Sequence, residues 1–202
     1  MTDWIIQTIT DLGYFGIFLV MLAESLFPPI PSELIIPFAG FAAANGDLSL
    51  AGVIATATLG AVVGMLPWYF AGRIFGLVRV RWLADRFGRF MAFNADEIDM
   101  AVVWFKRYGP IIVLFGRLIP LIRTLISIPA GLSRMPLWVF LLASTIGALV
   151  WNTFLTLAGF ILHEHYHVIE VVLDPLSYVV LALVVLIYLV RVVTWKPSRP
   201  TA

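Results

Sequence analysis

Residues 24–40 read ESLFPPIPSELIIPFAG and place a cluster of prolines inside an apolar region. The apolar pieces on either side, 13–27 and 34–44, are both shorter than the about 20 residues that a spanning helix needs. Non-helical backbone at membrane depth is tolerated only where it is buried in protein or lines a wet cavity. We therefore expect a re-entrant hairpin, and not a simple helix kink, with the chain breaking at Pro28, Pro29 and Pro31.

A second apolar arm of the same kind occupies residues 115–131, FGRLIPLIRTLISIPAG. It lies within the apolar stretch 110–133, and we expect it to be broken at Pro120 and again at Pro129. A charge at membrane depth costs at least about 2–3 kcal/mol, so such residues usually mark the path of an ion or a substrate. Each arm carries two of them around its first break: Glu24 and Glu33 in the first arm, Arg117 and Arg123 in the second.

The composition is that of an integral membrane protein. Of the 202 residues, 61% are hydrophobic and 12% are charged, and the mean hydropathy of +1.00 excludes an ordinary soluble domain. The chain has no cysteine, which excludes a disulfide framework and a Cys-ligated metal site. The N-terminal residues lack a basic region, so a cleavable signal peptide is not expected. We expect one all-α membrane domain over 1–202, with no cofactor and no nucleic-acid partner.

Hydrophobic periodicity and length predict the remaining elements. The pattern Asn94–Glu97 is typical of a capping box and opens an amphipathic helix that runs to Arg107. The expected elements are, in order, an amphipathic helix (2–12), the first arm, a span (51–72), a basic segment (73–89), the capped helix (94–107), the second arm, a span (137–162), a polar loop (163–170) and a last span within 172–193.

The order of these elements repeats within the chain, with repeats at about 2–75 and 94–162. Residues 56–74 align without a gap on residues 143–161, and Pro37–Gly40 resembles Pro129–Gly131. Chance similarity between small-residue apolar helices could give such matches, but the shared element order favours duplication. The identities are Thr58/Thr145, Gly60/Gly147, Ala61/Ala148, Val63/Val150, Ala71/Ala158, Gly72/Gly159 and Ile74/Ile161.

The distribution of charge predicts the orientation. If each arm enters and leaves the membrane on one side, every Lys and Arg except Arg117 and Arg123 lies on a single face. The opposite face then carries acidic residues such as Asp47 and Glu164. The positive-inside rule makes the basic face cytoplasmic. The N-terminus is then outside, the C-terminus is inside, and the two repeats are inverted.

Inverted hairpins bring their tips together near the membrane midplane, where two carboxylates could face two guanidinium groups. Arg presents a planar fork of donors that matches phosphate or carboxylate and keeps its charge when desolvated. Burial disfavours the charged form of Glu, while a neighbouring Arg favours it, so the arrival of a substrate could release or take up a proton. The four residues therefore suit proton-linked movement of a phosphate-bearing lipid whose tails stay in the bilayer.

The two arm segments, 24–40 and 115–131, resemble the signature segments of the DedA family, bacterial relatives of the SNARE-associated Golgi (VTT-domain) proteins. The resemblance extends from about Gly13 to Gly159. It implies a protein of the bacterial cytoplasmic (inner) membrane that flips or recycles lipids, notably undecaprenyl phosphate and phosphatidylethanolamine, in dependence on proton-motive force. The PPIPSE form is closer to the members linked to undecaprenyl phosphate. The family's essential acidic pair would fall on Glu24 and Glu33, and its essential arginines on Arg117 and Arg123.

We therefore expect an inverted-repeat transporter that moves a phosphate-headed lipid between leaflets with proton coupling. The main alternative is a small-molecule/proton antiporter, which needs a wet pocket closed to lipid. A membrane lipid phosphatase is disfavoured because the histidines all lie in the polar loop, which leaves no evident nucleophile. A scaffold without transport and assembly into a homo-oligomer are left open.

Several of these residues also have a purely structural interpretation. The charges of the two arms could form buried salt bridges that only hold the hairpins together, although such pairs are poor sources of net stability. Asn152 could line the path, but an interhelical hydrogen bond is the favoured interpretation. A hydrated loop is favoured over a metal site for His163, His165 and His167.

Overall fold

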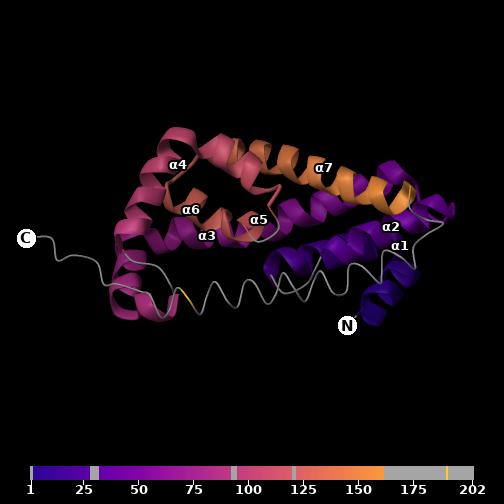
Figure 1. Ribbon diagram of the computed structural model, residues 1–202, viewed down its shortest axis with the longest axis horizontal. Helices are drawn as coiled ribbons and strands as arrows, with labels where there is room; N and C mark the ends of the chain where they lie inside the picture. The colour runs from indigo at the N-terminus through magenta and orange to yellow at the C-terminus, as the bar shows by residue number, and fades with distance from the viewer. Residues whose placement is uncertain (1, 28–31, 92–94, 120–121, 162–189, 191–202) are drawn as a thin grey trace, which may run out of the picture.

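The computed structural model describes residues 2–27, 32–91, 95–119, 122–161 and 190, and the regular elements within them are all α-helices. Two stretches, Leu50–Trp82 and Leu137–Ile161, are long and apolar enough to cross a membrane. An all-α chain with two candidate membrane spans is therefore confirmed for this part of the protein. The helices are α1 (Thr2–Leu26), α2 (Ser32–Ala44), α3 (Leu50–Met91), α4 (Ala95–Gly116), α5 (Ile122–Leu125), α6 (Ser127–Leu132) and α7 (Leu137–Ile161), as Figure 1 shows.

Both arms are interrupted where the charges cluster. In the first arm α1 ends at Leu26 and α2 begins at Ser32, and in the second arm α4 ends at Gly116 and α5 begins at Ile122. Some predicted features lie outside the described residues: the hairpin-break prolines Pro28, Pro29, Pro31 and Pro120, Asn94 of the capping pattern, the loop 163–170 with its three histidines, and the last span within 172–193 apart from Val190.

Two of the long helices bend at glycines with positive φ. Gly13 in α1 has φ 55° and ψ −127°, and Gly76 in α3 has φ 67° and ψ 163°. Glycine adopts such angles without the steric penalty of a Cβ. The bend at Gly13 separates the predicted amphipathic segment from the apolar arm. The helix that carries the first span runs past its predicted end at Gly72, and the basic segment after Gly76 is helical too.

Two predictions about prolines are wrong. The amphipathic helix does not end at Arg107 but runs through Pro110 to the end of α4. Prolines are tolerated inside membrane helices because neighbouring groups satisfy the freed backbone, and buried Val113 holds the following turn in the core. Pro129 does not break the second arm either, because it lies in the first turn of α6, where its missing N–H has no helical partner. The second interruption falls at Ile126 instead.

The helices of the two halves cross over. The first part of each arm packs on the span of its own half, α1 on α3 and α4 on α7. The second part packs on the span of the other half, α2 on α7 and α6 on α3. In Figure 1, α1 and α2 lie toward one end of the molecule and α4 and α6 toward the other, with α3 and α7 running between them. The spans therefore tie the two arms into one body.

Glycines at these crossings make corresponding contacts in the two halves. A Cβ at Gly40 would collide with the carbonyl oxygen of Thr156, and a Cβ at Gly131 would collide with that of Tyr69. Tyr69 and Thr156 are equivalent positions in the gapless alignment of 56–74 on 143–161. Gly159 meets Pro37 and its equivalent Gly72 meets Ile128 in the same way. These matched contacts are what duplication predicts, while the inverted orientation of the copies stays a prediction.

Two apolar clusters fill the body and leave a polar layer between them. The first joins α1, α2, the start of α3 and the end of α7, with Ile17, Ile36, Val53 and Leu155 among its members. The second joins the middle of α3 to α4, α6 and the start of α7, and includes Met65, Tyr69, Val113 and Phe140. On α3 and α7 the residues between these clusters are Ala61, Ala148, Trp151 and Asn152, which line the candidate site.

Candidate functional site

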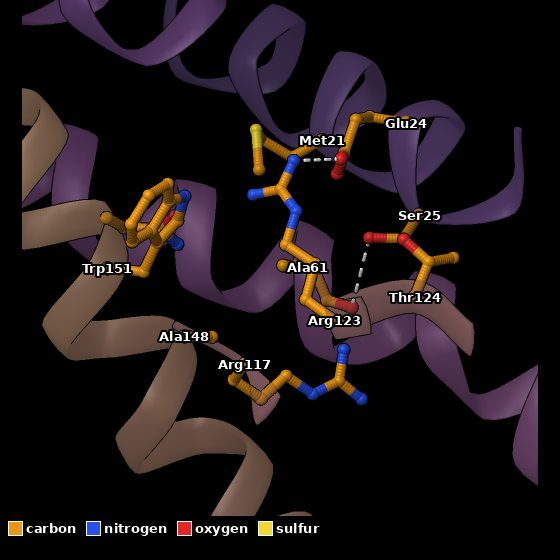
Figure 2. Close-up of a pocket in the computed structure, with 10 residues that line it drawn as sticks. Met21, Glu24, Ser25, Ala61, Arg117, Arg123, Thr124, Ala148 and Trp151 are labelled. Atoms are coloured by element: carbon orange, nitrogen blue, oxygen red, sulfur yellow. Dashed lines mark hydrogen bonds and ion pairs between the residues drawn. The ribbon is translucent and has the colours of Figure 1, made fainter. Parts of the chain in front are cut away.

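A small buried cavity lies in the polar layer between the two clusters, where the broken ends of both arms meet the spans. Its volume is about 20 Å³, room for about one water molecule. Figure 2 shows Glu24 and Arg123 meeting at this cavity, with the Arg117 side chain lying apart from the pair. The lining residues are Met21, Glu24, Ser25, Ala61, Arg117, Arg123, Thr124, Ala148, Trp151 and Asn152.

Both carboxylates of the first arm contact the same arginine. Glu24 and Arg123 are 3% and 9% exposed, and an Nη2 hydrogen of Arg123 is donated to Glu24 Oε1 in a buried ion pair drawn in Figure 2. Arg123 Nη2 also lies 3.7 Å from Oε1 of Glu33, whose side chain is 28% exposed. The predicted approach of acidic and basic arms is thus present, but it converges on Arg123.

Arg117 is buried among neutral groups. It is 5% exposed, and its Nη2 donates to Ser127 Oγ at 2.9 Å and to Met65 Sδ at 2.7 Å. Its guanidinium carbon lies 5.8 Å from the centre of the Phe140 ring, within range of a cation–π contact. Among the described residues, no carboxylate lies within ion-pair distance of Arg117, and its Nε–H has no acceptor. One arginine is therefore neutralised by carboxylates and the other is not.

The ends of the helices explain part of this difference. Arg117 follows the carboxyl end of α4, where its N–H donates to Val113 O at 3.1 Å, and Glu33 lies in the first turn of α2. Each charge suits the dipole of its helix end, an effect of about 0.3–1 kcal/mol. Glu24 lies in the last turn of α1, where the dipole disfavours a negative charge. The charged form of Glu24 therefore depends on Arg123.

A family model for the VTT domain matches residues 27–161, a range that contains Glu33, both arginines and both spans. The chain belongs to the VTT-domain family. This confirms the resemblance to DedA proteins that the arm segments show.

Curated relatives of this VTT-domain protein match it along most of their length. A Staphylococcus aureus protein named undecaprenyl phosphate transporter A is 34% identical over 95% of this chain and 96% of its own. A Bacillus subtilis protein of the same name is 30% identical, covering 82% of this chain and 80% of its own. A Lactococcus lactis protein named alkaline phosphatase-like protein is 38% identical, covering 98% and 94%. No solved structure gives a significant match.

These matches place the VTT-domain protein in a membrane family with transporter relatives and not among enzymes. The phosphatase in the Lactococcus name is stated only as a likeness. The sequence predicts a relation to proteins linked with undecaprenyl phosphate, and the names of these two relatives confirm it.

Asn152 makes the interhelical hydrogen bond that was the favoured interpretation, and a role in a transport path stays a prediction. Its Nδ2 donates to Thr58 Oγ1 at 3.2 Å, which is an interhelical hydrogen bond between α7 and α3. The same residue, 1% exposed, also lines the cavity. The hydrogen bond fixes the rotation of α7 and so holds the lining of the cavity in place.

Of the lining residues, only Glu24, Arg117, Arg123 and Asn152 were predicted from the sequence. Among the residues that were not predicted are Ser127 and Met65, which contact Arg117, and Trp151, which lines the cavity. The internal repeat carries a signal for one of them. Met65 aligns with Asn152 in the gapless alignment, so the buried polar Asn152 marks its partner as a position that faces the site. Ser127 and Trp151 carry no such signal, since neither residue type is unusual in an apolar segment.

Proposed function

We propose that this VTT-domain protein moves a lipid with a phosphate headgroup, of the undecaprenyl phosphate type, between the leaflets of the bacterial cytoplasmic membrane. The observation that carries the proposal is the burial of Arg117 with no carboxylate at ion-pair distance among the described residues. Burying a guanidinium group without a counter-charge costs free energy, so a residue of this kind usually serves a function. An anionic substrate that binds to it supplies the missing negative charge. Arg matches the oxygens of a phosphate group in geometry and in charge.

The surroundings of the cavity favour a lipid over a soluble anion. The faces of α1, α3, α4 and α7 away from the core expose large apolar side chains, as surfaces in contact with bilayer do, among them Phe15, Val63, Phe115 and Phe154. A headgroup that enters between the arms can leave its tail in this apolar environment. The substrate named for the two transporter relatives is undecaprenyl phosphate, a phosphate attached to a long apolar chain.

The ion pair between Glu24 and Arg123 supplies a physical route to proton coupling. Both residues are buried, and a phosphate that takes Arg123 as its partner leaves the Glu24 carboxylate without its counter-charge. An unpaired buried charge is costly, so the carboxylate takes up a proton when the phosphate arrives. When the phosphate leaves, Arg123 returns to Glu24 and the proton is released. Lipid movement and proton movement are then linked through one residue.

Contacts at the ends of the arms support two re-entrant hairpins that enter from opposite sides. Arg81 forms an ion pair with Asp99 near the start of α4, and the Met135 carbonyl after α6 accepts a hydrogen bond from Tyr69 at 2.5 Å. The start of α4 thus lies by Arg81 of α3, and the residue after α6 lies by Tyr69 in the middle of α3. At the other end of α3, Ser49 N donates to the Tyr14 hydroxyl at 2.7 Å, which ties the start of the first arm to its exit.

Binding to the full chain in lipid nanodiscs tests the proposed substrate. We expect undecaprenyl phosphate to bind at least about tenfold more tightly than undecaprenol, because only the phosphate meets the arginines, and more tightly than phosphatidylethanolamine. Arg117→Lys should weaken undecaprenyl phosphate binding by roughly tenfold, since an ammonium group cannot reproduce the planar fork of donors. Arg134→Lys, an exposed position, is the matched control. Equal binding of the phosphate and the alcohol would contradict the proposal, and tight binding of a soluble cation instead would favour the antiporter.

A further inference from the structure

The indole N–H of Trp151 is a buried hydrogen-bond donor at the cavity. No described residue accepts a hydrogen bond from it. Its Nε1 atom is buried and has no hydrogen-bond acceptor among those residues. The side chain lines the cavity together with Glu24, Arg117 and Arg123. Figure 2 shows the ring on the α7 side of the cavity, facing the region where Arg123 meets Glu24.

A buried N–H without an acceptor among the described residues is expected to find one outside the described part of the chain. A buried N–H without a partner costs about 1–3 kcal/mol, and buried Trp usually finds an acceptor for its N–H. Trp68 shows the usual case, because its Nε1 donates to the Ser25 carbonyl at 3.0 Å. Among the described residues Glu24 Oε1 accepts from Arg123, and Trp151 Nε1 has no acceptor. A group that enters the cavity can supply this acceptor.

The packing of Trp151 holds the donor in a defined direction. The ring packs against the first apolar cluster and lies 6.1 Å from the Phe154 ring, one turn further along α7. The adjacent Asn152 fixes the rotation of α7 through its hydrogen bond to Thr58. An indole N–H is a donor only and carries no charge, so it complements an acceptor-rich group without needing a counter-ion.

We propose that Trp151 donates a hydrogen bond to a phosphate oxygen of the lipid headgroup, alongside the arginines. This inference rests on the proposed function and adds a specificity-determining contact to it. The cavity described here has room for about one water molecule, so the headgroup enters only when the arms separate and a phosphate oxygen takes the acceptor position. The neutral donor favours headgroups that present an acceptor there, and it rejects an amine or an alkyl group at the same place.

Trp151→Phe tests the contact because it keeps an aromatic ring and removes only the N–H. With the full chain in nanodiscs, we expect this variant to bind farnesyl phosphate, a short isoprenyl phosphate, roughly tenfold more weakly than wild type, as for loss of a hydrogen bond to a charged acceptor. Farnesol should bind both proteins equally. Trp138→Phe is the matched control, because Trp138 lies on the same helix and is 70% exposed. Its binding should equal that of wild type.

Nuclear magnetic resonance of the wild-type chain with 15N-labelled tryptophan gives a second, independent measurement. The indole resonance that is missing in Trp151→Phe should move downfield with farnesyl phosphate and stay in place with farnesol. Wild-type affinity in Trp151→Phe, or an unmoved resonance at saturating farnesyl phosphate, would overturn the inference even if the variant folds poorly. If the wild-type chain itself fails to prefer farnesyl phosphate over farnesol, it is the proposed function that fails.

Discussion

Arg117 and Arg123 stand six positions apart on either side of one break, yet their surroundings differ. Arg123 meets Glu24 and Glu33, whereas Arg117 is held by Ser127, Met65 and Phe140. This difference suggests two tasks: Arg117 offers a positive charge to the headgroup, and Arg123 exchanges its carboxylate partner for it. The structural alternative, in which ion pairs only hold the hairpins together, accounts for Arg123 but leaves Arg117 without a reason to be buried.

Glu24→Gln separates the two interpretations at the residue scale. The amide keeps the shape of the side chain but cannot ionise, so we expect gradient-driven lipid transport to be lost while lipid binding stays within about threefold of wild type. Breaking a buried ion pair can cost about 3–5 kcal/mol, but Glu33 remains beside Arg123 and should limit the loss of stability. Glu33→Gln, at the more exposed carboxylate, should have the smaller effect. A large drop in melting temperature, with binding and transport falling together, would instead support a purely structural role.

The four charged residues could be predicted from the sequence because charges in apolar segments are rare and costly. Their pairing could not be predicted, since it depends on which way each broken helix end points. Ser127 and Trp151 escaped prediction for a related reason. A serine or tryptophan is ordinary in a membrane segment, and only the packing shows that one contacts Arg117 and that the other leaves its N–H without an acceptor.

At the scale of the elements, breaks could be predicted more reliably than the bounds of the helices. Proline clusters and short apolar pieces correctly indicated two interrupted arms. Pro129 was a poor guide, because it lies in a first turn that accepts it, and the predicted end at Arg107 was wrong because α4 continues through Pro110. The crossing of α2 onto α7 and of α6 onto α3 could not be read from periodicity at all. It is visible only in the matched contacts of the glycines.

Those contacts predict matched effects of substitution in the two halves. Gly40→Ala and Gly131→Ala should each destabilise the protein by about 1–3 kcal/mol, because the added methyl group meets a backbone carbonyl of the opposite span and not a movable side chain. Gly109→Ala is the control, since its methyl group meets the flexible end of Met135. Melting temperatures in detergent or nanodiscs measure the effect. Wild-type melting temperatures in both variants would contradict close packing at the crossings.

For the whole molecule, charge distribution and internal repetition predict an inverted pair of hairpins. The Met135 carbonyl, next to Arg134, accepts hydrogen bonds from Tyr69 and Arg73 of α3, while the inverted topology and its basic face stay predictions. Repetition could be recognised in the sequence because small residues at crossings keep their positions.

Cysteine labelling tests the orientation directly, because the chain has no cysteine of its own. Asp47 and Arg134 are both exposed and lie at opposite ends of the predicted spans. In intact cells, Asp47→Cys should react with a membrane-impermeant maleimide, and Arg134→Cys should react only after permeabilisation. The reverse pattern would contradict the inverted-repeat topology with its basic face inside.

The central claim is that the protein couples the movement of a phosphate-headed lipid to protons. It is tested most directly by lipid flux in vesicles that contain only the purified chain. Vesicles loaded with a fluorescent isoprenyl phosphate should show transfer between leaflets that speeds up several-fold under an imposed pH gradient and is slowed when the gradient is collapsed. The matching isoprenyl alcohol should give no protein-dependent gain in either condition. The account would be contradicted if the phosphate lipid were transferred no faster than in protein-free vesicles. It would also be contradicted if the rate of transfer did not depend on the pH gradient.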